Sequence, residues 1–111
     1  MLGEFTSVTE IEKVLPRFLP APFTRGRFKA EIPITYFYLS DFVHMDVVSA
    51  PEPTRFTAKV AQLHQLAVSP NGKFGFHVTT CDGKMAHTVD WEDSWAAFYA
   101  KLLKGVAKLG Y

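Results

Sequence analysis

Residues 34–43, Ile-Thr-Tyr-Phe-Tyr-Leu-Ser-Asp-Phe-Val, decide the fold of this 111-residue chain. The run is rich in β-branched and aromatic side chains, which favour a strand. A second strand-like run, Phe23 to Ala30, precedes it, and Glu31 to Pro33 make a short connection between the two. The sequence therefore predicts an antiparallel pair of strands.

Apolar residues at helical spacing predict three helices outside this pair. The first covers Glu4 to Leu15 and is stopped by Pro16, which has no N–H to donate. The second opens at Pro53 and reaches Ala67, since proline is favoured in a first helical turn. The last runs from about Asp90 to Leu109, with Gly110 as its C-cap.

The segment between the last two helices is expected to be extended. Phe74 to Cys81 has strand-like composition, and Asp82-Gly83 is a turn dipeptide that folds it back. The resulting order is helix, strand, strand, helix, extended segment, helix. Because no βαβ unit repeats, the predicted fold class is α+β.

Composition narrows the classes of protein and partner. A hydrophobic fraction of 48% with 21% charged residues is typical of one globular domain or a piece of one. The formal charge of +1 provides no electrostatic footprint, so neither nucleic acid nor a membrane is expected as a partner. The single cysteine, Cys81, fits a reducing compartment, and a cytoplasmic location is expected.

No short motif carries catalysis by itself, since a Gly-rich phosphate loop, a nucleophile elbow and paired cysteines are all missing. The histidines His44, His64, His77 and His87 are scattered without the i, i+4 spacing of a helical ligand pair, so no metal site is expected. Cys81 is interpreted as a small buried hydrophobic residue rather than a nucleophile.

Two tryptophans and two acids stand together near the start of the last predicted helix. Trp91 and Trp95 flank Glu92 and Asp93, which indicates a first turn with dipole-stabilising acids and two rings packed inward. The alternative is that the rings stack on a ligand. Glu4, taken alone, is a first-turn carboxylate of the first helix.

Several segments gain meaning from their order along the chain. They are Gly3-Glu4-Phe5, Leu19-Pro20-Ala21-Pro22, the strand 36–43, Ala61-Gln62-Leu63-His64, the block 72–81 that begins Gly-Lys-Phe-Gly-Phe, and Trp91-Glu92-Asp93-Ser94-Trp95. In this order they resemble the fructosamine (ketosamine) kinases, also called protein-ribulosamine 3-kinases, and especially the fungal members. The resemblance covers essentially the whole chain.

The resemblance implies part of a protein-kinase-like fold close to the aminoglycoside phosphotransferases. Residues 1–43 would form the end of the small lobe, from helix C through two antiparallel strands to the hinge, and residues 44–111 would begin the large lobe with its helices. The family moves the γ-phosphoryl group of ATP to the 3-hydroxyl of a ketosamine on a protein lysine. Glycated protein lysines are thus the expected substrate, and ATP and Mg²⁺ the expected cofactors of the full enzyme.

The resemblance also implies roles for individual residues. Glu4 matches the helix-C glutamate that pairs with the phosphate-binding lysine. Ser40 takes the gatekeeper position. The Asp41 carbonyl would accept from the adenine amino group, and the Val43 N–H would donate to the adenine ring.

Other parts of the family's machinery have no counterpart in this sequence. The Gly-rich loop and phosphate-binding lysine would lie before Met1, and the catalytic loop and magnesium-binding aspartate after Tyr111. We therefore expect a truncated, inactive copy that binds no cofactor tightly. The alternative is a non-catalytic interaction remnant, which self-associates through the uncovered sheet because a two-stranded sheet is marginal alone.

Overall fold

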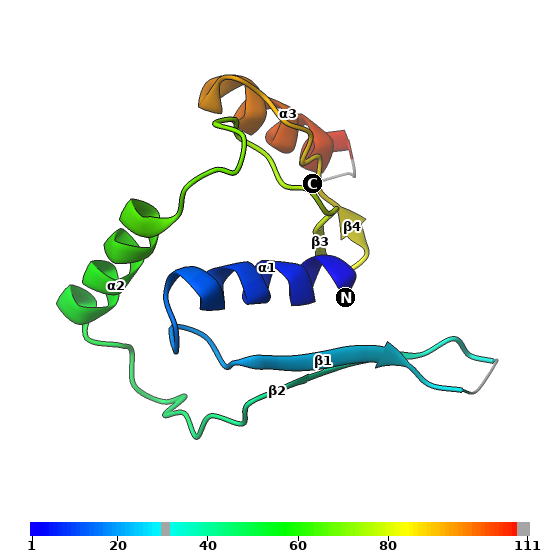
Figure 1. Ribbon diagram of the computed structural model, residues 1–111, viewed down its shortest axis with the longest axis vertical. Helices are drawn as coiled ribbons and strands as arrows, with labels where there is room; N and C mark the ends of the chain where they lie inside the picture. The colour runs from blue at the N-terminus through cyan, green and yellow to red at the C-terminus, as the bar shows by residue number, and fades with distance from the viewer. Residues whose placement is uncertain (30–31, 109–111) are drawn as a thin grey trace. The chain divides into compact units, whose positions relative to one another are not determined.

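The computed structural model describes residues 1–29 and 32–108. Its elements are helices α1 (Leu2–Val14), α2 (Pro53–Leu66) and α3 (Trp95–Lys108) and strands β1 (Pro22–Arg27), β2 (Tyr36–Ser40), β3 (Cys81–Asp82) and β4 (Met85–Ala86) (Figure 1). The strands form two antiparallel pairs, β1 with β2 and β3 with β4. This arrangement confirms the predicted α+β class.

The chain divides into two compact units, which are described separately. One comprises Met1–Thr6 with Val68–Tyr111, and the other is Ser7–Ala67. No helix within the described ranges is long and apolar enough to cross a membrane. The predicted division at residues 43 and 44, between two lobes, stays a prediction.

The β1–β2 pair is held in register around a glycine. Gly26 lies opposite Phe37, and a Cβ on Gly26 would come within 2.5 Å of the Phe37 ring. Phe28 packs on the same ring, with centroids 5.2 Å apart. The ring therefore occupies the space that Gly26 leaves open, which ties the two strands together.

The predicted strand pair is thus confirmed, with shorter strands. The strand pairing ends where Arg27 lies opposite Tyr36. One hydrogen bond, from Phe28 N to Thr35 O at 3.0 Å, extends it beyond that pair. Ala30 and Glu31, at the expected connection, lie outside the described residues.

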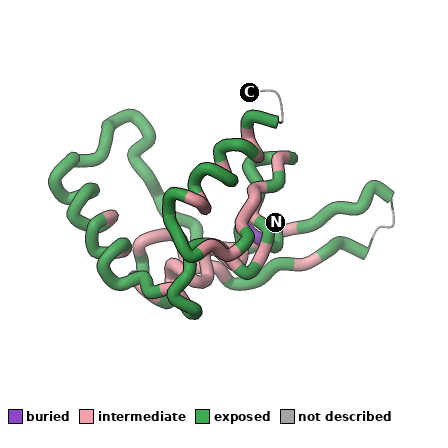
Figure 2. Tube along the Cα trace, turned by 90° about the horizontal axis from the view of Figure 1, so that it is seen from above, coloured by how far each residue is buried: buried purple, intermediate pink, exposed green. Residues whose placement is uncertain are grey.

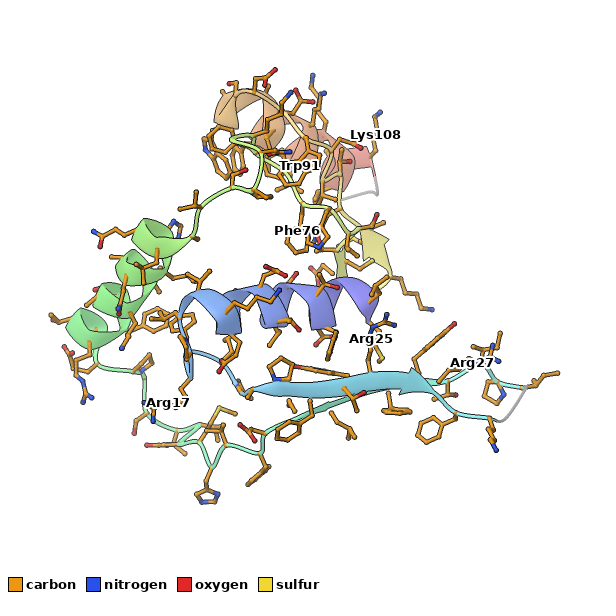
Figure 3. The ribbon with its side chains drawn as sticks, viewed as in Figure 1. Arg17, Arg25, Arg27, Phe76, Trp91 and Lys108 are labelled. Carbon is orange, nitrogen blue, oxygen red and sulfur yellow. The ribbon has the colours of Figure 1, made fainter. Side chains whose placement is uncertain are left out.

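Helix α1 begins at Leu2, two residues before the expected Glu4. It ends at Val14, two residues before Pro16. Arg17, at the corner that Figure 3 labels, has a positive φ of 63°. Its N–H donates to both carboxylate oxygens of Glu12, at 3.0 and 3.2 Å. Leu15 is 7% exposed and is the one buried hydrophobic side chain among the described residues. Because Glu12 belongs to α1, the turn that follows the helix is closed by a side chain of the helix itself.

The predicted start of the last helix at Asp90 is wrong. Phe74 and Glu92 exchange two backbone hydrogen bonds of 2.8 Å, which hold residues 91–93 outside the helix. Ser94 then caps α3, because its carbonyl accepts from Phe98 N at 3.0 Å and its hydroxyl from Ala97 N at 3.4 Å. The helix begins at Trp95, and Leu109 and Gly110 lie outside the described residues.

The interpretation of the tryptophans and acids changes accordingly. Glu92 and Asp93 precede the helix instead of filling its first turn, and each pairs with a lysine: Glu92 with Lys101, and Asp93 with Lys73 at 3.1 Å. Trp91 is half-buried, but Trp95 is 56% exposed, so the inward packing expected for both rings is wrong for Trp95.

The expected extended segment 74–81 is mostly irregular. Phe76 N donates to Val89 O at 2.9 Å, and a regular strand is limited to the two-residue β3. Its turn is made by Gly83, at φ +57°, and Lys84, one residue later than predicted. Cys81 is exposed, so its interpretation as a buried hydrophobic residue is wrong.

The start of α1 lies very close to the backbone near Thr79. A Cβ on Gly3 would come within 2.3 Å of the Thr79 carbonyl oxygen and 2.9 Å of Thr80 Cα. These are backbone atoms and cannot rotate away. We therefore expect Gly3→Ala to lower the free energy of unfolding by about 1–3 kcal/mol, the cost of overpacking, measured by urea denaturation.

Gly105→Ala in α3 is the matched control. Its Cβ would meet the Thr88 hydroxyl at 2.9 Å, a side-chain group that can turn aside. Alanine also favours a helix by up to about 1 kcal/mol over glycine, so this variant is expected to be neutral or stabilised. Equal stability of Gly3→Ala and the parent chain would contradict the close approach.

Candidate functional site

The segment that follows β2 is anchored at its start. Ser40 is the last residue of β2 and lies opposite Pro22. Asp41 N donates to the Ala21 carbonyl at 2.9 Å. The Ser40 hydroxyl lies 3.4 Å from the Asp41 carbonyl oxygen, a long hydrogen bond that leaves this oxygen most of its capacity to accept. The position of Asp41 is therefore fixed by backbone pairing.

Beyond Asp41 the chain has no regular secondary structure and is exposed to solvent up to residue 50. Phe42 is 89% exposed and Val43 45% exposed. Figure 2 shows that most of the described chain is exposed or intermediate and that little of it is buried. Among the described residues, none accepts a hydrogen bond from Val43 N–H. A main-chain acceptor at Asp41 and a main-chain donor at Val43 are thus presented two residues apart, beside a fixed strand end.

A turn orders the next stretch of chain. The Asp46 carboxylate accepts from Val48 N at 2.9 Å and from Ser49 N at 3.2 Å. These bonds favour the ionised form, led by that from Val48, so the pKa of Asp46 is lowered. Such side chain-to-backbone bonds are typical of an Asx turn.

A second carboxylate begins α2. Glu52 is the N-cap, and its side chain accepts from Thr54 N at 3.0 Å and Arg55 N at 2.7 Å. The bond from Arg55 contributes most to lowering the pKa of Glu52. Glutamate is not among the favoured N-cap residues. The sequence therefore predicts that the helix begins at Pro53 but does not identify Glu52 as its N-cap. The end of the predicted helix is confirmed within one residue.

Glu4 lies in the first turn of α1 and is exposed. Its carboxylate is favoured there by the helix dipole. It belongs to the unit that contains residues 68–111, whereas Ser40, Asp41 and Val43 belong to the other unit. Ser40, Asp41 and Val43 therefore lie together in one unit, and Glu4 is described with the other.

Two further groupings were not apparent from the sequence. Around Trp95, the rings of Phe74, Phe98 and Tyr99 have centroids 5.6–5.8 Å from the indole. A hollow of about 320 Å³ at the start of α2 is lined by Pro51, Glu52, Arg55, Phe56 and Lys59. Across residues 1–29 and 32–108, no group of three or more His, Cys, Asp or Glu side chains could hold a metal ion.

The order of helix, antiparallel pair, exposed connecting segment and further helices is consistent with part of a kinase-like fold. The family model described as fructosamine kinase matches residues 2–105, so the chain belongs to the fructosamine kinase family. No curated protein and no solved structure gives a match to the chain.

The Glu52 cap makes the start of α2 sensitive to acid. A carboxylate whose pKa is lowered in the folded state stabilises that state above its ordinary pKa of 4.5 and loses this effect as pH falls through the lowered value. We expect amide exchange at Thr54 and Arg55 to quicken, relative to the intrinsic rate, as pH falls below about 4.5.

Glu52→Gln is the matched control, because its amide oxygen can accept a hydrogen bond but does not titrate in this range. Its amide protection is expected to be lower at neutral pH and to lack the acid-dependent step. The same step in both chains would show that another group controls it.

Proposed function

We propose that this chain supplies the adenine-binding hinge and the helix-C glutamate of an ATP-dependent kinase that phosphorylates ketosamines on protein lysines. The observation that carries the proposal is the family match over residues 2–105. The finer assignment is phosphorylation of the 3-hydroxyl of ribulosamine or fructosamine adducts by a fungal-type member. The cytoplasm is the proposed location, where a reducing environment suits the exposed thiol of Cys81.

The hinge proposal is supported by the segment after β2. Adenine presents an amino donor beside a ring-nitrogen acceptor, and Asp41 and Val43 offer the complementary carbonyl and N–H. Backbone pairing to Ala21 holds Asp41 in place. Ser40, the last residue of β2, is proposed as the gatekeeper residue. Because the two contacts use main-chain atoms, they depend on backbone course more than on side-chain identity.

The role proposed for Glu4 is supported by its place in α1. Glu4 is exposed on the first turn of α1, so its carboxylate is accessible to a lysine from a strand. In kinases this pair orients the lysine on the α- and β-phosphates. Glu4 is therefore a positioning residue, acting through that lysine.

The triphosphate and Mg²⁺ fit the described residues poorly. ATP, when bound, supplies the phosphoryl group, but no carboxylate cluster suited to a metal lies within the described part of the chain. We also propose that residues 1–43 are the end of a small lobe and residues 44–111 the start of a large lobe. The alternative function is that of a non-catalytic interaction remnant. In that case the chain would self-associate through the β1–β2 sheet, where Phe28 and Leu39 are 53% and 52% exposed.

Nucleotide binding by the 111-residue chain tests the hinge. Two hydrogen bonds of about 0.5–1.5 kcal/mol each barely offset an association cost of at least ~4 kcal/mol. We expect ATP to bind no better than about millimolar, followed by NMR titration. Val43→Pro removes the donor N–H and should weaken binding about 2–10-fold, whereas Val43→Ala, which keeps it, should not.

Two results would contradict this account of the hinge. One is equal ATP binding by Val43→Pro and Val43→Ala. The other is phosphate transfer from labelled ATP to a fructosyl- or ribulosyl-lysine peptide by the 111-residue chain, purified free of host kinases.

Glu4 is tested in a longer chain. The coding DNA flanking this sequence is expected to encode a Gly-rich loop and lysine upstream and a His-Gly-Asp-type catalytic loop downstream. That longer chain should phosphorylate a ketosamine peptide, and Glu4→Gln should lower its kcat on the order of 100-fold by misplacing the lysine. Glu10→Gln, on the same helix and paired with Lys13 at 2.7 Å, is the control expected to retain activity. Neighbouring DNA without either loop would overturn the kinase proposal for this gene.

A further inference from the structure

The turn between α2 and Phe74 contains the only asparagine of the sequence. Asn71 is followed directly by Gly72, and both residues are exposed. Gly72 has a positive φ of 71°, and apart from its chain neighbours no described atom lies within 4 Å of the place where a Cβ would stand. The main-chain nitrogen of Gly72 is therefore unobstructed beside the side-chain amide of Asn71.

The Asn71 side chain is held against its own main chain. Its Oδ1 accepts from Lys73 N at 3.0 Å, a bond typical of an Asx turn. The Ser69 hydroxyl also lies 3.0 Å from Oδ1, and 2.6 Å from the Lys73 carbonyl oxygen. Because Gly72 N lies between Asn71 and Lys73 along the main chain, the bond to Lys73 N keeps the side-chain carbon Cγ close to Gly72 N.

The main chain at Gly72 is free to react with that carbon. Across residues 1–29 and 32–108, no group accepts a hydrogen bond from Gly72 N–H, so losing its proton breaks no bond within the protein. If Gly72 N attacks Cγ, negative charge develops on Oδ1, where the Lys73 N–H already donates. A donor that is in place before the reaction stabilises such a charge.

We propose that Asn71 and Gly72 form a self-modification site at which Asn71 deamidates without an enzyme. Gly72 N gives its proton to solvent and bonds to Cγ. The Cγ–Nδ2 bond then breaks, and Nδ2 takes a proton from water and leaves as ammonia. Water opens the resulting succinimide: breaking the bond from Gly72 N to Cγ gives aspartate, and breaking its bond to the Asn71 carbonyl carbon gives isoaspartate. Water is the one co-reactant, and nothing is oxidised or reduced.

The modification acts on the backbone pairing that precedes α3. In isoaspartate the main chain runs through Cγ, which adds one methylene before Gly72. Phe74, two residues later, exchanges two hydrogen bonds of 2.8 Å with Glu92. The longer main chain is expected to weaken this pairing, whereas aspartate leaves the main chain unchanged.

Incubation of the 111-residue chain at neutral pH measures the reaction. Each event raises the mass by about 1 Da and adds a negative charge to a chain of formal charge +1, so ion exchange separates the products and peptide mass spectrometry locates them. The folded chain is expected to react about 2–10-fold faster than the same chain in urea, the worth of one hydrogen bond at Oδ1. Asn71→Gln should give no such product, because its longer side chain cannot close the five-membered ring. A folded chain that reacts no faster than the unfolded one overturns the proposal.

Asp82→Asn in an Asn71→Gln background is the matched control. It creates the same dipeptide in the β3–β4 turn, where Gly83 also has a positive φ, of 57°, and open space around its missing Cβ. In the described part of the chain no donor bonds to the Asp82 side chain, so this site should react about 2–10-fold more slowly than Asn71. A rate at this site equal to that of Asn71, or faster, would show that the Lys73 N–H contributes nothing and would overturn the proposal.

Amide exchange of the purified isoaspartyl form tests the effect on the fold. The Phe74 and Glu92 amides are expected to exchange about 2–10-fold faster than in the unmodified chain, as for the loss of one hydrogen bond. Asn71→Asp, which has the new charge but the normal main chain, should exchange as the unmodified chain does. Unchanged exchange in the isoaspartyl form, or equal quickening in Asn71→Asp, contradicts the effect assigned to the longer main chain.

Discussion

The pairing of β1 with β2 fixes the position of the candidate hinge. Gly26 leaves space that the Phe37 ring fills, and this contact sets which residues of the strands lie opposite one another. The register then carries Ser40 to Pro22 and the Asp41 N–H to the Ala21 carbonyl. A shift by one residue would turn Ser40 to the opposite face and move the carbonyl and N–H groups that follow it.

Carboxylates control several of the places where the chain changes direction. Glu12 accepts a hydrogen bond from Arg17 N–H after α1. Asp46 accepts from two N–H groups after the segment that follows β2, and Glu52 accepts from two more at the start of α2. In each case a carboxylate satisfies backbone donors that helix or sheet leaves unpaired. Local hydrogen bonding, more than burial, therefore defines the path of the chain between the elements of the unit Ser7–Ala67.

The sequence predicts well those features that depend on local pattern. Aromatic and β-branched composition locates the strand at 36–40, and Pro53 locates the start of α2. The same reasoning fails between residues 74 and 94, where the outcome depends on pairing across the chain. Glu92 has helical neighbours in sequence, but its backbone bonds to Phe74 keep it extended, and Ser94 was the one local sign of a later start.

The candidate site shows the same division. The contacts proposed at Asp41 and Val43 use main-chain atoms and do not depend on which side chains stand there. The segment was therefore recognised by its position after a strand and not by its composition. The position of Glu4 in the first turn of a helix was predictable from the apolar spacing that follows it. The Glu52 cap and the contact of Phe74 with Trp95 were not predictable from the sequence, because they depend on side-chain direction and on pairing between distant residues.

The contact at Gly3 has a consequence for folding during synthesis. Gly3 and Thr79 are 76 positions apart, yet the start of α1 reaches its final surroundings only when the backbone at Thr79 is in place. At about 5–20 residues per second, a ribosome needs roughly 4–15 s to make the intervening chain. Through that interval the first turn of α1 lacks its neighbour, and a chaperone that binds nascent apolar segments has time to reach Leu2 and Phe5 before the loop closes.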